Sequence, residues 1–144
     1  MRGPSPNPSP LESAVRLLAG RDYTAAELEG RLERAGIDPQ DRRAVLERLA
    51  ADGYLDDDRV AHERAARLAE RGYGDAAIRA DLERRGVDAP LVKDALGALQ
   101  PEAERAMGLF VKLGRGARAV RALARKGFSE ASIEAALDGV AQDP

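Results

Sequence analysis

Residues 23–38, YTAAELEGRLERAGID, decide the fold, because the pattern returns fifty residues later as YGDAAIRADLERRGVD at residues 73–88. In each copy a tyrosine precedes a run of helix-forming residues, and a glycine, an apolar residue and an aspartate close it. Leu28 and Leu32 have apolar counterparts in the second copy. Side chains four residues apart share one face of an α-helix, so each copy predicts an amphipathic helix ending near a glycine.

The repeat extends outward on both sides of this core. Leu18 matches Leu68 before it, and Leu46 matches Leu96 after it. A shift of 41 from the second copy gives a third, with Gly114 in place of the tyrosine. The unit predicted three times is therefore three short helices, and neighbouring units pack on one another. The expected helices are 11–19, 24–35, 39–51, 57–71, 75–85, 89–99, 102–113, 116–126 and 129–140.

These observations predict an all-α fold of three tandem three-helix, helix-turn-helix-like repeats in an elongated, curved array. The expected divisions are a disordered Pro-rich lead-in at 1–10 and repeats at 11–53, 54–100 and 101–144. Local signals agree with these divisions. Thr24 and Glu27 have the spacing of a capping box, and Asp38 with Pro39 marks a helix start. Tyr23 and Tyr73 are interpreted as plugs of their units' cores rather than as ligand contacts.

The composition excludes several classes of protein. The 144 residues include no cysteine or tryptophan and one histidine, which rules out disulfides, thiolate catalysis and Cys-containing zinc sites. Alanine, leucine, arginine and glutamate dominate, and the scarcity of β-branched and aromatic residues argues against a sheet. No apolar run is long enough to cross a bilayer. We expect a cytoplasmic, monomeric protein without membrane contact.

Catalytic machinery is not recognisable in the sequence. His62 has no serine or cysteine nucleophile beside it, and we interpret it as a solvated or partly packed side chain. Asp56, Asp57 and Asp58 favour a helix start over a metal site, since carboxylates there meet the positive end of the helix dipole. The glycines around Arg115 lack the features of a phosphate-binding loop. The sequence predicts no enzyme activity, catalytic residue, metal or cofactor.

Charge is unevenly distributed despite a net value of only −2. The interval 106–129 contains no acid and six basic residues, which we take as candidate partner-binding residues: Lys112, Arg115, Arg118, Arg121, Arg125 and Lys126. At about 100° per residue the four arginines span roughly 120° of a helix, leaving Val120, Leu123 and Ala124 for the core. Arginine forks suit phosphate and carboxylate partners alike, so nucleic acid and an acidic protein surface both remain open. A plain solvated face also remains open.

Several stretches resemble a known family. Residues 54–61, YLDDDRVA, are similar to a signature of the RecX family, the regulators of the bacterial RecA recombinase. Residues 71–74, RGYG, with the apolar and glycine positions that follow through Val87, resemble a second stretch of that family. The turn at 21–24 with Glu27 resembles its first repeat. The resemblance covers about residues 11–140 and includes the series of three-helix units.

The resemblance implies a negative regulator that binds the RecA nucleoprotein filament and suppresses ATP hydrolysis, strand exchange and coprotease activity. It thereby implies roles in homologous recombination, DNA repair and the SOS response. The arginines of the third unit would meet acidic protein surface or the phosphates of single- or double-stranded DNA, and Arg79 and Arg84 would add contacts, as would Arg31 and Arg34. Two alternatives stay open: a helix-turn-helix DNA-binding regulator that ignores RecA, and a generic helical interaction scaffold.

Overall fold

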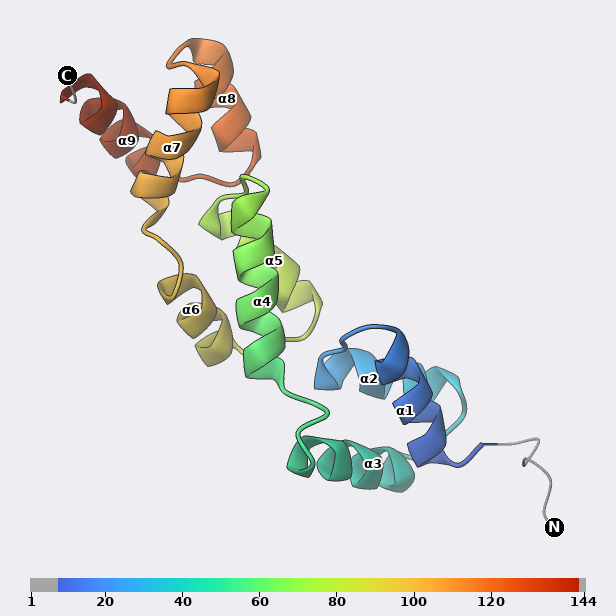
Figure 1. Cartoon of the computed structure of the whole chain (residues 1–144). Helices are drawn as coiled ribbons and strands as arrows, with labels where there is room; N and C mark the ends of the chain where they lie inside the picture. The colour runs from blue at the N-terminus through green and yellow to red at the C-terminus, as the bar shows by residue number, and fades with distance from the viewer. Residues whose placement is uncertain (1–7, 143–144) are drawn as a thin grey trace. The chain divides into compact units, whose positions relative to one another are not determined.

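The computed structural model describes residues 8–142, and all its regular elements are α-helices (Figure 1). In chain order they are α1 Pro10–Gly20, α2 Ala25–Arg34, α3 Pro39–Ala51, α4 Asp57–Glu70, α5 Asp75–Arg84, α6 Ala89–Gly97, α7 Glu102–Leu113, α8 Ala117–Arg125 and α9 Glu130–Gln142. The prediction of an all-helical chain of three-helix repeats is confirmed. The helix bounds differ from the predicted ones by at most two residues at either end.

The helix starts show which local signals decide the boundaries. Thr24 and Glu27 form the predicted capping box, and Ser9 with Glu12 forms another before α1. That second box starts α1 at Pro10, inside the predicted lead-in; residues 1–7 of the lead-in lie outside the described residues. Asp38 precedes α3 as predicted, but its side chain makes no capping hydrogen bond. Pro39, with its preset φ, therefore marks that start.

The chain divides into two compact units. The first contains the chain up to Val60 together with Arg85–Val87; the second contains Ala61–Arg84 and the chain from Asp88 onward. The core of the first unit comes from α1, α2, α3 and the following turn: Ala14, Tyr23, Leu28, Leu32, Val45, Leu49 and Leu55. Tyr23 is buried there as predicted, and its ring also contacts the Arg21 guanidinium.

The second unit has a core beneath α7, α8 and α9: Ala106, Phe110, Ala119, Leu123, Phe128, Ile133 and Ala136. Ala61, Ala65 and Leu68 on one face of α4 are also buried in this unit. Tyr73 is partly buried rather than fully buried. Its ring also faces the Lys126 ammonium, 4.8 Å from the centroid.

A close backbone approach within the second unit joins the α4–α5 turn to the α8–α9 turn. The Gly74 N–H donates to the Lys126 carbonyl at 2.7 Å, and a Cβ on Gly74 would lie 2.4 Å from the Gly127 carbonyl carbon. Glu102, the first residue of α7, accepts from the Asp75 N–H at 2.6 Å and from the Ser129 N–H at 3.0 Å. One carboxylate thus holds the start of α5 and the residue before α9 together.

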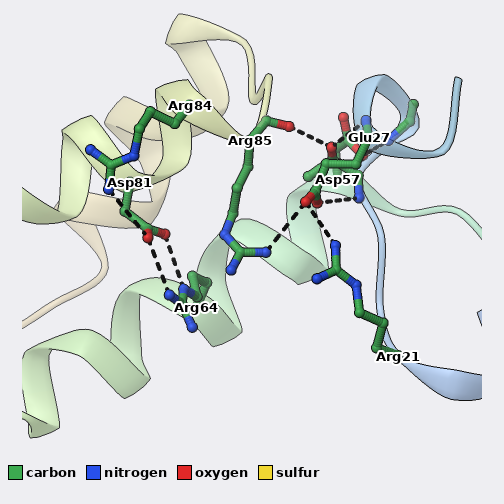
Figure 2. Close-up of polar contacts among 9 residues, drawn as sticks. Arg21, Glu27, Asp57, Arg64, Asp81, Arg84 and Arg85 are labelled. Atoms are coloured by element: carbon green, nitrogen blue, oxygen red, sulfur yellow. Dashed lines mark hydrogen bonds and ion pairs between the residues drawn. The ribbon is translucent and has the colours of Figure 1, made fainter. Parts of the chain in front are cut away.

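The first unit contains a related contact. The Thr24 hydroxyl donates to the Arg85 carbonyl, and a Cβ on Gly86 would lie 2.4 Å from the Cβ of Ala26. Asp57 accepts from the Ala25 N–H at 2.8 Å, so the first residue of α4 caps α2 much as Glu102 caps α5. We call each of these contact regions a joint. One joint connects residues of the first and second repeats, and the other connects residues of the second and third repeats. Figure 2 shows Asp57 in this contact region, with Arg21 and Arg85 reaching toward Glu27.

Within residues 8–142, no helix has both the length and the apolar character needed to cross a bilayer.

Candidate partner-binding surface

The end of α7, the turn after it, and α8 with its C-cap carry most of the predicted site residues. Gly114 ends α7 with φ of 83°, and its N–H donates to the Phe110 carbonyl at 2.8 Å. A left-handed φ suits glycine because other residues pay a steric penalty there. Gly116 stands at the start of α8, where it offers no side-chain cap. The turn is therefore tight, and the residue that caps α8 supplies no side-chain acceptor to the first N–H groups of the helix.

One face of α8 is buried and the other is cationic. Ala119 and Leu123 are buried, whereas Arg118, Arg121 and Arg125 are exposed. The sequence placed Ala124 in the core, and this was wrong: Ala124 is exposed and Ala119 takes the inner position. The buried pair is four residues apart and so defines the inner face.

The predicted stripe of four arginines is only partly helical. Arg115 lies in the turn before α8, so three arginines share the helix and the fourth precedes it. Lys112, in the last turn of α7, is also exposed. We call these five residues the cationic surface: Lys112, Arg115, Arg118, Arg121 and Arg125.

The acidic residues between positions 8 and 142 do not neutralise the cationic surface. Among residues 8–142, no carboxylate forms an ion pair with any of these five side chains. Clustered like charges repel one another, and a partner that supplies negative charge relieves this repulsion. The planar guanidinium offers two parallel donors to a carboxylate or phosphate. The surface is thus chemically suited to an anionic partner.

Lys126 has a different position from the other predicted cations. Its ammonium donates to the Arg71 carbonyl at 3.1 Å and lies over the Tyr73 ring. These contacts give it a structural role at the joint within the second unit. Lys126 is exposed enough to meet a partner, but it is already engaged.

The two predicted residues on α5 are also exposed. Arg84 lies 3.7 Å from Asp81, the carboxylate that also receives two hydrogen bonds from Arg64 (Figure 2). Arg84 is therefore partly compensated, unlike the arginines of α8. Arg79 lies on the same helix. The eight predicted residues therefore come from α5, from the end of α7, from the α7–α8 turn, and from α8 with the residue that follows it.

Two apolar residues beside the cationic surface were not predicted from the sequence. Val111 and Leu113 leave 75% and 59% of their surfaces exposed at the end of α7. The repeat contained the signal: at a shift of 41, the corresponding residues of the second copy are Glu70 and Gly72. The third copy therefore has large apolar side chains where the second copy has a charged residue and a glycine. Both apolar side chains are too exposed to belong to the core.

Acidic residues contribute to folding in this structure. Asp56 accepts from the Arg59 N–H at 3.1 Å at the start of α4, as predicted for a helix start. Burial alone would raise the pKa of Glu102, but hydrogen bonds from the Ser129 and Asp75 N–H groups, aided by serine hydroxyls, lower the pKa below its ordinary value. Within the part of the chain that the structure describes, no group of His, Asp or Glu side chains has an arrangement that could hold a metal ion.

The repeats and the surface define a class: a tandem three-helix-repeat protein that presents a cationic face. Comparisons with known proteins identify the family. The model of the first three-helix domain of RecX matches residues 11–49, and that of the second three-helix domain matches residues 56–96. The chain belongs to the RecX family.

Individual relatives support the same family assignment. The chain is 34% identical over 138 residues to the regulatory protein RecX of Xanthomonas campestris, covering 89% of this chain and 85% of that protein. It is 39% identical over 142 residues to the regulatory protein RecX of Deinococcus radiodurans, covering 92% and 68%. The crystal structure of RecX from Lactobacillus salivarius has a TM-score of 0.81 at 18% identity, covering 93% of this chain and 96% of that one, which supports the fold.

Proposed function

We propose that this chain is a cytoplasmic negative regulator of the RecA recombinase. It binds the RecA nucleoprotein filament and inhibits ATP hydrolysis, strand exchange and coprotease activity, and so limits homologous recombination, DNA repair and the SOS response. It acts by binding rather than by catalysis. Membership of a family whose relatives are named regulatory proteins supports the regulatory role. The observation on which the binding mode rests is the uncompensated cationic surface of the third repeat.

Tandem repeats suit a polymeric target for a physical reason. Separate surfaces on one chain, such as the cationic surface and the α5 residues Arg79 and Arg84, can contact a target that itself repeats. Once one surface is bound, the next binding step is intramolecular, and individually weak contacts add up. A chain bound in this way restricts the movements between recombinase subunits that accompany nucleotide turnover.

Direct binding to DNA is the competing interpretation. Three-helix units can place a helix in a major groove, and arginine contacts phosphates readily. The overall charge of −2 does not favour a non-specific DNA binder. Aromatic residues make up only 3% of the chain, which leaves few platforms for stacking single-stranded bases.

The test is the rate of ATP hydrolysis by RecA on single-stranded DNA while the purified chain is titrated in. Arg118→Glu with Arg121→Glu removes the centre of the cationic surface. Arg16→Glu with Arg43→Glu is the matched control, because both residues are exposed, lie elsewhere and change the net charge equally. Circular dichroism checks that both variants keep their helicity.

The wild-type chain and the control pair are expected to suppress hydrolysis at similar concentrations. The α8 pair is expected to need at least about tenfold more protein, the effect of losing contacts worth about 1.4 kcal/mol. A fully helical α8 variant that inhibits like the wild type removes the cationic surface from the mechanism. A gel-shift without RecA separates direct DNA binding from filament binding.

A further inference from the structure

The end of α7 combines features that nucleic acid recognition alone does not explain. Val111 and Leu113 are largely exposed apolar residues that flank Lys112 of the cationic surface. Protein interfaces pair apolar residues with arginine at their centres, whereas contacts to a phosphate backbone use charged and polar groups. The apolar pair therefore favours a protein surface as the occupant.

The internal repeat allows α8 to be compared with α5 position by position. Ile78 and Leu82 of α5 correspond at a shift of 41 to Ala119 and Leu123 of α8, and all four are buried. This register matches Ala77 to Arg118. The comparison of the two helices can therefore be made residue by residue.

In the second unit, the α8–α9 turn approaches the first turn of α5 closely. A Cβ on Gly127 would lie 2.6 Å from the backbone nitrogen of Ala77. In the first unit, a Cβ on Gly86 would lie 2.4 Å from the Cβ of Ala26, in the first turn of α2. Arg118, at the position of α8 that matches Ala77, is exposed, whereas Ala77 is partly buried.

The first residues of α2 and α5 indicate which chemical group would suit the start of α8. The first N–H of α2 donates to the Asp57 carboxylate at 2.8 Å, and the first N–H of α5 donates to the Glu102 carboxylate at 2.6 Å. α8 starts after Gly116 with no side-chain cap. Arg115 precedes this start and Arg118 lies in its first turn, so a carboxylate there would meet both the helix N-terminus and guanidinium donors.

We propose that the α7–α8 end docks an acidic protein segment: its carboxylates bind the start of α8 and the cationic surface, and its apolar side chains cover Val111 and Leu113. This deepens the proposed function by making the filament contact a protein contact, and it rests on that function for the identity of the partner. Val111 and Leu113 can pack against apolar side chains of a protein partner, whereas the phosphates of a nucleic acid offer them no apolar contact.

The experiment uses the full chain and three probes: RecA filaments on single-stranded DNA, oligothymidine alone, and a synthetic amphipathic peptide of about 18 residues with leucines on one face and glutamates elsewhere. A second peptide carries serine in place of leucine. Val111→Ser with Leu113→Ser removes the apolar pair and leaves every charge in place. Val15→Ser with Tyr54→Ser is the control, since these residues are also large, apolar and exposed. Circular dichroism verifies the fold of each variant.

We expect the leucine peptide to bind the wild type, and the serine peptide to bind it at least about tenfold more weakly. The apolar-pair variant, Val111→Ser with Leu113→Ser, should lose at least about tenfold affinity for both the leucine peptide and the filament. Affinity of that variant for oligothymidine should not change. The proposal is overturned if the apolar-pair variant binds both protein probes like the wild type, or if oligothymidine binds the wild type more tightly than the leucine peptide does.

The failures are distinguishable. If the wild type ignores RecA filaments but binds the leucine peptide through Val111 and Leu113, the proposed function fails and the docking surface stands. If the wild type binds and inhibits the filament regardless of this pair, the proposed function stands and the docking surface is refuted.

Discussion

Replacing Glu102 with alanine should loosen the joint within the second unit. Its two carboxylate oxygens accept from the N–H groups of Asp75, at 2.6 Å, and of Ser129, at 3.0 Å. Losing one helix cap costs about 1 kcal/mol, so losing two predicts about 2 kcal/mol. Because the acceptor is charged, the total rises to about 3 kcal/mol. Glu104→Ala, an exposed position in the same helical turn, is the matched control and should change stability by less than about 0.5 kcal/mol.

Native-state hydrogen exchange at the amides of Asp75 and Ser129 measures this effect locally. A loss of about 2–3 kcal/mol corresponds to about 30- to 150-fold faster exchange at these two sites. Urea unfolding followed by circular dichroism supplies the global value. Exchange at both amides that is no faster in Glu102→Ala than in Glu104→Ala would refute the double-capping account.

The same carboxylate makes a prediction about pH. The pKa of Glu102 is lowered in the folded state despite the burial that opposes this, because the hydrogen bonds stabilise the carboxylate. Its contribution is therefore complete at neutral pH, above the unfolded-state pKa, and is lost as the pH falls through the lower folded-state pKa. The stability difference between the wild type and Glu102→Gln should shrink on acidification. A difference that grows toward low pH would contradict this sign.

Three further changes test the packing. Gly74→Ala should destabilise by about 3 kcal/mol, at the upper end for overpacking, because its Cβ would meet backbone; Gly97→Ala, which meets open space, should be neutral or stabilising in the same urea titration. Thr24→Val should cost about 1–3 kcal/mol in thermal unfolding, since it removes the hydrogen bond to the Arg85 carbonyl and a helix cap; no loss would argue against that hydrogen bond. Ala119→Leu should cost about 1–3 kcal/mol while Ala124→Leu is tolerated, and the reverse order would contradict the register of α8.

Most of the fold could be predicted because the local signals and the repeat agree. The capping box at Thr24, the proline at position 39 and the glycine turns each mark a boundary independently of tertiary packing. The internal repeat then predicted that the helices come in groups of three. Ala124 was misplaced because alanine carries little hydrophobic signal, so two orientations of an alanine-rich helix look nearly alike in sequence.

The joints within the units could not be predicted from local pattern. Asp57 and Glu102 cap helices 32 and 27 residues away, and no periodicity connects a carboxylate to a distant N–H. Asp57 looked like an ordinary helix-start acid. Gly127 could be assigned to a turn, but the approach of another backbone that excludes a side chain there depends on tertiary structure.

The candidate surface was predicted in part. The absence of acids in 106–129 identified the arginines of α8, and all three are exposed. The engagement of Lys126 with Tyr73 and the compensation of Arg84 by Asp81 required coordinates. Exposure of Val111 and Leu113 also required them, because an apolar residue at a helix end is usually interpreted as core.

The most direct test of whether the third repeat binds the filament is hydrogen–deuterium exchange. It compares the full chain when free and when bound to RecA filaments on single-stranded DNA. We predict that binding slows exchange in residues 109–125, with the largest change at the α7–α8 turn and the start of α8. Saturated binding that leaves this segment unchanged, or that protects only the first unit, would contradict the central claim.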